Sequence, residues 1–134
     1  MIMVYKLTLP GQPVTKKNSQ QILKNNRTGK YFVAPSRKYT LYENTCLWYL
    51  RRCEGFPPDP ISRPVNVCCL YYMKDRHRCD LVNLLEATND ILVKGRILAD
   101  DHSGIVAAHD GSRVLLAEDP EQARVEITIT EVEP

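Results

Sequence analysis

The sequence predicts a small α/β (α+β) domain in which a mixed β-sheet packs against two main helices. Apolar and polar residues alternate in short segments near both ends of the chain, which is the period of a half-buried strand. In two longer segments the apolar residues recur at helical spacing. The chain has 134 residues, 43% of them apolar and 25% charged, which is enough for one globular core. We therefore expect a single domain over residues 1–134.

The N-terminal third contains signals for a strand, a hairpin and a helix. Residues 3–9 alternate as a strand that Pro10 ends. Residues 22–33 hold two short apolar runs around an Asn- and Gly-rich turn, which indicates a hairpin. Ser36 is a typical N-cap, and aromatic residues at helical spacing then predict a helix over residues 37–53.

The middle of the chain predicts a strand followed by the second helix. Residues 65–73 are apolar at both odd and even positions, which indicates a central strand covered on both faces. Asp80 is a suitable N-cap for a helix that runs to about Lys94 and stops at Gly95. Its inward stripe is expected to be Leu81, Leu84, Leu85, Thr88, Ile91 and Leu92, with Val82, Asn83, Glu86 and Asp90 on the opposite arc.

The C-terminal part predicts only strands. Residues 105–109 and 113–117 flank Asp110-Gly111, a dipeptide typical of tight hairpins, so we expect these two segments to pair with each other. Residues 125–129 alternate apolar and polar side chains, as in a strand with one wet face.

Charge is distributed unevenly along the chain. Residues 1–96 contain 16 Lys and Arg against 7 Asp and Glu (+9), whereas residues 97–134 contain 2 against 9 (−7), and the two parts sum to +2. A basic majority can indicate a polyanionic partner. It can also be a solvated surface with no such partner, and the charge alone favours this second explanation.

Several function classes are not expected. No apolar run approaches the ~20 residues of a membrane span, and residues 1–10 do not have the pattern of a signal peptide. The cysteine count is odd and without any C-x-x-C pair, which favours reduced, buried thiols over zinc or disulfides. These observations predict a cytoplasmic protein. The cysteines are Cys46, Cys53, Cys68, Cys69 and Cys79.

Carboxylates stand at both ends of the second predicted helix. A basic run leads into Asp80, and Asp100-Asp101 follow the helix. Such a helix is about 22 Å long, so Asp80 and Asp101 meet only if the chain after Gly95 folds back along it. Capping and a solvated acidic turn would explain these residues without any function. A Mg²⁺ site would explain them too, because Mg²⁺ prefers oxygen ligands.

This stretch resembles the RusA family of phage- and bacteria-encoded Holliday junction resolvases. In that family a basic run precedes Asp-x-Asp-Asn-Leu, and a second acidic element, often Asp-Asp, follows a helix about twenty residues later. The opening strand, the segment from Pro13 to Lys17, the first helix and the closing strand also fit, so the resemblance spans nearly the whole chain. The matching motif residues are Arg76, Arg78, Asp80, Asn83, Leu84, Asp100 and Asp101.

The resemblance implies a homodimeric, Mg²⁺-dependent (Mn²⁺ is an alternative) endodeoxyribonuclease that resolves four-way junctions and other branched DNA in recombination and repair. It places metal ligands at Asp80, Asp100 and Asp101, with Asp80 and Asp101 catalytic. DNA contacts are expected from Lys16, Lys17, Arg76, Arg78, Asn83 and Lys94.

Three positions depart from the family pattern. The second motif aspartate is Val82, the basic residue before the first aspartate is Cys79, and a helix lysine is Glu86. Val82 and Glu86 are four residues apart and so neighbours on the helix. Our hypothesis is that Glu86 supplies the missing carboxylate to the metal and catalytic site. The alternative is a solvated Glu86 and a degenerate site.

Two other functions stay open. A protein of the same fold can bind junctions without cutting them, and the departures at Val82 and Cys79 would then be signs of decay. A small α/β scaffold without any nucleic-acid partner is the third possibility. The aromatic pair Tyr31 and Phe32 on the predicted hairpin either stacks on an exposed base or packs in the core.

Overall fold

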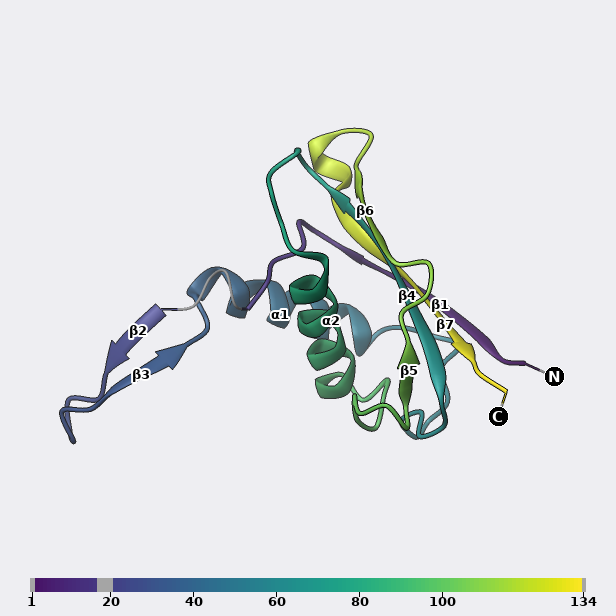
Figure 1. Ribbon diagram of the computed structural model, residues 1–134, viewed down its shortest axis with the longest axis horizontal. Coiled ribbons are helices and arrows are strands. Elements are labelled where there is room, and N and C mark those ends of the chain that lie inside the picture. The colour runs from purple at the N-terminus through teal and green to yellow at the C-terminus, as the bar shows by residue number, and fades with distance from the viewer. Residues whose placement is uncertain (1, 17–20, 134) are drawn as a thin grey trace.

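The structure is a computed structural model that describes residues 2–16 and 21–133. Its mixed, five-stranded main sheet has β7 between β1 and β4, with antiparallel pairing on both sides. Two α-helices, a short 3-10 helix (Pro120–Gln122) and a separate two-stranded sheet are the other elements of the described residues (Figure 1). The elements are β1 (Val4–Pro10), β2 (Gln21–Lys24), β3 (Tyr31–Ala34), α1 (Arg37–Leu50), β4 (Val65–Met73), α2 (Leu81–Lys94), β5 (Val106–Ala108), β6 (Arg113–Leu116) and β7 (Arg124–Glu131). The predicted small α+β fold is confirmed.

One face of the sheet carries the core. Alternate residues of β1, β4 and β7 are buried, and the register places them on the same face, as with Leu7, Ile127 and Cys69. Residues of α1 and α2 join them in one hydrophobic cluster. The opposite face of β4 is only half-buried, at Asn66, Cys68, Leu70 and Tyr72. The prediction that β4 is central is therefore confirmed, but the prediction that both its faces are covered is wrong.

The predicted hairpin between residues 105 and 117 does not form. β5 and β6 both pair with β4, in parallel, at the two ends of its outer edge. Side chains bridge the break between them. The Asn66 amide exchanges two hydrogen bonds with the Asp110 backbone, and the Ser112 hydroxyl accepts one from the Cys69 N–H. Asp110-Gly111 is thus an interruption in an edge strand, at which Gly111 takes a φ of 87°.

Both helices begin at the predicted N-caps. The Ser36 hydroxyl accepts a hydrogen bond from Tyr39 N, and the Asp80 carboxylate accepts one from Val82 N. Gly95 ends α2 as predicted, whereas α1 stops at Leu50, three residues before the predicted end. The α2 stripe is confirmed in outline, because Leu84, Thr88, Ile91 and Leu92 are buried together with Ala87.

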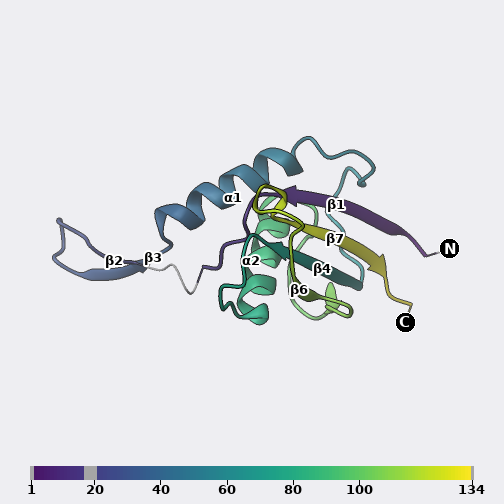
Figure 2. The ribbon, with the colours of Figure 1, turned by 90° about the horizontal axis from the view of Figure 1, so that it is seen from above.

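The two-stranded sheet of β2 and β3 is a hairpin that projects from the main body. Figures 1 and 2 show it extending beyond the N-terminal end of α1, at the opposite end of the molecule from both chain termini. Every residue from Gln21 to Val33 is exposed. The predicted hairpin is confirmed.

Candidate functional site

Helix α2 carries the candidate site and makes polar contacts at three points along its length. At its start, Asp80 caps the helix. In the middle, the buried hydroxyls of Tyr71 and Thr88 lie 2.7 Å apart, and Thr88 donates its proton to the Leu84 carbonyl, so Tyr71 is the donor between them. At its end, Lys94 forms an ion pair with Glu43 of α1 at 2.9 Å. The contacts with Tyr71 and Glu43 hold the middle and the end of α2 against β4 and α1.

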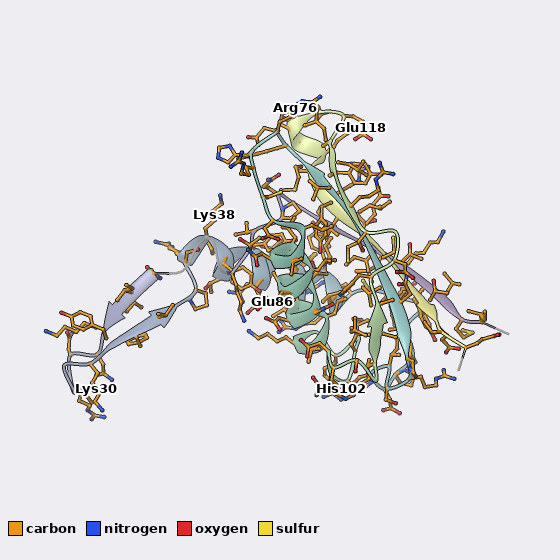
Figure 3. All side chains as sticks on the ribbon, in the orientation of Figure 1. Lys30, Lys38, Arg76, Glu86, His102 and Glu118 are labelled. Carbon is orange, nitrogen blue, oxygen red and sulfur yellow. The ribbon has the colours of Figure 1, made fainter. Side chains whose placement is uncertain are left out.

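Asp80 and Asp101 lie at opposite ends of α2. The helix has 14 residues and is therefore about 21 Å long. After Gly95 the chain turns at Arg96, whose φ is 62°, and then forms a parallel bridge between Ile61 and Leu98 beside the start of β4. It does not fold back along α2, so the condition for Asp80 and Asp101 to meet within one chain is not fulfilled. Figure 3 shows the two ends: Arg76 lies above the start of α2 and His102 below its end.

Asp100 and Asp101 form an exposed acidic turn. The Asp100 carboxylate accepts a hydrogen bond from the Asp101 N–H at 2.7 Å, which orients the Asp100 side chain. Within the described parts of the chain, no group of three or more His, Cys, Asp or Glu side chains converges. The oxygen donors suit Mg²⁺. One chain, however, gathers at most part of a ligand set at either end of α2.

The residues that depart from the family pattern lie on the outer side of α2. Val82 is 67% exposed, and Glu86, one turn further along, is exposed as well. Figure 3 shows Glu86 on the flank of α2 turned toward the hairpin side of the molecule. Asn83 is half-buried. Glu86 is six residues from Asp80, which is about 9 Å along the helix axis, so one chain places it nearer to Asp80 than to Asp101.

The predicted DNA-binding cations fall into two groups. Arg76 and Arg78 are exposed in the loop that leads into α2. By contrast, Lys94 is paired with Glu43, and Lys16 lies 3.0 Å from Asp90 and over the ring of Tyr39. Lys17 lies outside the described residues. The loop arginines are therefore better placed for phosphate than the two paired lysines.

A cavity of about 370 Å³ opens beside the start of α2. Its apolar lining includes the buried Met73 and Leu84. Its charged lining is mostly cationic, with Lys38, Lys74 and Arg78 against the single carboxylate of Asp75. Burial and the neighbouring Asp80 carboxylate raise the pKa of the Cys79 thiol on its wall, which keeps that thiol neutral. The cavity thus brings Lys38 of α1 together with Lys74 and Arg78 of the loop that leads to Asp80.

The predicted DNA-binding set did not include Lys38 or the cations of the hairpin, Lys24, Arg27 and Lys30. A signal for them exists in the sequence, because residues 1–42 contain Lys and Arg but neither Asp nor Glu. The predicted set contains Lys16 and Lys17 from this segment but none of the hairpin cations.

The class of protein that these features define is a small α+β domain with exposed carboxylates at both ends of one helix and exposed cations beside its start. The family described as endodeoxyribonuclease RusA matches residues 10–130. The chain belongs to this family, and the resemblance noted in its sequence is thereby confirmed. A search of curated proteins finds no match. No helix in the described part of the chain is long and apolar enough to cross a membrane.

Proposed function

We propose that this protein is a Mg²⁺-dependent, structure-selective endodeoxyribonuclease that cuts four-way junctions and other branched DNA in recombination and repair, as a cytoplasmic homodimer. The observation that carries the proposal is the family match over residues 10–130, which includes the carboxylates at both ends of α2. Mn²⁺ is the alternative metal.

A dimer would supply what one chain does not gather. Two copies of α2 that run antiparallel across a two-fold axis would bring Asp80 of one chain beside Asp101 of the partner subunit, and the converse pair would form at the other end. The outer side of α2, with Val82 and Glu86, is exposed and compatible with this arrangement. Two equivalent sites would suit a junction that has two-fold symmetry.

Each residue has a defined part in this proposal. Asp80 and Asp101 would hold the metal, Asp100 would orient the acidic turn, and Glu86 would add a further carboxylate. Bound Mg²⁺ lowers the pKa of a coordinated water and neutralises charge that develops on the phosphate. Arg76 and Arg78 would hold the phosphate of the DNA strand, with guanidinium groups that match its geometry. Asn83, one turn into α2, would position a ligand or a water.

The test is an incubation of an end-labelled four-way junction with the protein, with and without Mg²⁺. We expect paired nicks that require the metal and that disappear in Asp80→Asn and in Asp101→Asn. A mixture of the two inactive variants should recover nicking, because a mixed dimer retains one site with both aspartates. Recovery is impossible if each site is built within one chain, so failure to recover would contradict the shared site.

The exposed Val82 favours a second candidate function, a junction-binding protein that no longer cuts, because the family has a carboxylate at this position. A mobility shift of the junction without nicks under any Mg²⁺ or Mn²⁺ concentration would support that function. Absence of both nicks and a salt-sensitive shift would instead leave a scaffold without nucleic-acid binding.

A further inference from the structure

The β2–β3 hairpin exposes apolar side chains on both of its faces. Its register pairs Ile22 with Val33 and Leu23 with Phe32, so the two pairs point in opposite directions. Tyr31, Ile22 and Val33 share one face and are 71%, 73% and 62% exposed. On the other face, Leu23 and Phe32 are 39% and 47% exposed. No other element of the described chain exposes every one of its large apolar residues.

This exposure indicates that something outside the chain covers the hairpin. A two-stranded hairpin is at best marginally stable alone in water. Both views show it standing away from the main sheet, so the core does not cover it (Figures 1 and 2). Contiguous exposed apolar surface on a folded protein marks an interaction site.

The hairpin is also uniformly basic, and its tip is well ordered by local hydrogen bonds. Between Gln21 and Lys38 there are five cations and no carboxylate: Lys24, Arg27, Lys30, Arg37 and Lys38. The Asn25 side chain accepts hydrogen bonds from the N–H groups of Arg27 and Thr28, and the Asn25 N–H donates to the Lys30 carbonyl. The Lys24 ammonium lies 5.8 Å from the centre of the Tyr31 ring. Cations and an aromatic ring are thus presented together.

Charge decides between the partners that could cover this surface. A second copy of the chain would have to bring a surface that is both apolar and acidic. Single-stranded nucleic acid offers flat bases and negatively charged phosphates along its whole length. Its bases stack on aromatic rings and its phosphates attract cations, and such binding tolerates any base sequence. The polyanion also fits the absence of Asp and Glu from residues 1–42.

We propose that the β2–β3 hairpin is an arm that binds unpaired nucleotides of DNA, with Tyr31 stacked on a base and Lys24, Arg27 and Lys30 on the flanking phosphates. The proposal rests on the proposed function, because a branched substrate is where an endonuclease of this kind meets unpaired nucleotides. It adds a contact remote from the carboxylates of α2, so the two are separable by experiment.

The test measures the affinity of the full chain for a fluorescent oligo-dT of about 20 nucleotides by anisotropy, in EDTA so that no cutting occurs. Tyr31→Ser is compared with Tyr49→Ser, the same substitution at an exposed tyrosine of α1. A lost stacking contact should weaken binding roughly 5- to 150-fold in Tyr31→Ser. Tyr49→Ser should stay within about twofold of wild type, and circular dichroism melts should show that both variants fold.

A second pair of variants tests the phosphate contacts without touching the aromatic ring. Lys24→Gln with Lys30→Gln should flatten the dependence of log K on log salt by about 1.4, since each contact to a single strand contributes about 0.7. Lys6→Gln with Arg51→Gln changes the net charge equally at exposed positions of β1 and at the end of α1, and should leave the slope unchanged.

Two binding results would overturn the arm: an unchanged oligo-dT affinity in Tyr31→Ser, or an unchanged salt slope in the double variant of Lys24 and Lys30. A third result would come from sedimentation, if the dimer dissociates in Tyr31→Ser while its affinity for oligo-dT persists. The last would assign the hairpin to a second copy of the chain. Wild type that binds oligo-dT through Tyr31 but never nicks a junction would contradict the nuclease and leave the arm standing. If nicking depends on Asp80 but oligo-dT binding does not change in Tyr31→Ser, the arm is contradicted and the nuclease stands.

Discussion

At the residue scale, a single substitution at position 82 tests both the metal-dependent cleavage and the stability of the fold. Val82 stands at the second position of α2, is 67% exposed, and donates its backbone N–H to the Asp80 cap. A carboxylate there would point into solvent near the positive end of the helix dipole. The family pattern has an aspartate at this position.

We therefore expect Val82→Asp to keep or raise stability, by about 0.3–1 kcal/mol, rather than to disrupt the fold. Metal-dependent nicking of a four-way junction should increase, or emerge if wild type has none. A thermal melt reports the first effect and the nicking assay the second. A melting temperature several degrees below that of wild type would show that the side chain is buried after all.

Two buried thiols predict how stability changes in alkaline solution. Burial raises the pKa of Cys46 to about 11 and of Cys69 to about 12, well above that of an unfolded thiol. Between about pH 9 and 11 the unfolded chain has released these protons and the folded chain retains them. As the pH rises above 9, the free energy of unfolding therefore falls by about 1.4 kcal/mol per pH unit for each thiol.

The melting temperature should accordingly fall between pH 9 and 11, more steeply than in Cys69→Val, in which one of the two thiols is absent. Burial also raises the pKa of Tyr71 and Tyr39, with the same sign above pH 10. A flat profile up to pH 11, or equal slopes in wild type and variant, would contradict the burial of these groups. Melts followed by circular dichroism give the measurement.

At the scale of elements, α2 is both a structural helix and the carrier of the candidate site, and Asp80 has a part in each. Asparagine caps helices about as well as aspartate, whereas alanine does not. Asp80→Asn should therefore abolish nicking at nearly unchanged stability, while Asp80→Ala should abolish nicking and cost about 1 kcal/mol as well. Urea unfolding of the two variants separates the cap from the chemistry. Equal stability of both would mean that the hydrogen bond to Val82 contributes nothing.

The end of α2 is packed closely against α1 through Gly95. A Cβ at this position would collide with the side chain of buried Leu50 and lie 3.2 Å from the Ile91 carbonyl. Gly95→Ala should destabilise the protein by about 1–3 kcal/mol through overpacking. Leu50→Val should recover part of that loss in the double variant, because it removes a methylene at the collision. Simple additivity of the two single effects would show that they do not touch.

At the scale of the whole molecule, the cations of the chain lie in different places and differ in their ion pairs. The hairpin lies at one end and both termini at the other (Figure 2). Arg76 and Arg78 are exposed beside the cationic cavity, while Lys16 and Lys94 are neutralised by Asp90 and Glu43. Only some of the predicted cations are therefore available to phosphates.

Junction binding should depend on salt accordingly. Replacing Arg76 and Arg78 by Gln should flatten the slope of log K against log salt by up to about 4 for a dimer, at roughly 0.9 per contact. Lys94→Gln should change the slope by less, because the Lys94 ammonium already forms an ion pair with Glu43. Glu133→Gln, near the C-terminus, serves as the control and should leave the slope unmoved. Equal effects of Lys94 and Arg76 variants would mean that the ion pair opens on DNA.

Local rules were sufficient for much of this fold. The caps at Ser36 and Asp80, the stop at Gly95 and the strand over residues 65–73 follow from backbone chemistry that acts within a few residues. The motif around Asp80, which carries much of the resemblance to the family, is local as well. These features needed no knowledge of long-range contacts.

Only the tertiary structure decided the pairing of residues 105–117 and the positions of the carboxylates. Asp110-Gly111 favours a hairpin locally, but the Asn66 and Ser112 side chains and the free edge of β4 offer more hydrogen bonds to the extended chain. Likewise, a bridge from Ile61 to Leu98 carries the chain away from α2 and holds Asp101 far from Asp80. Both outcomes depend on partners more than thirty residues away in sequence, which a local pattern cannot weigh.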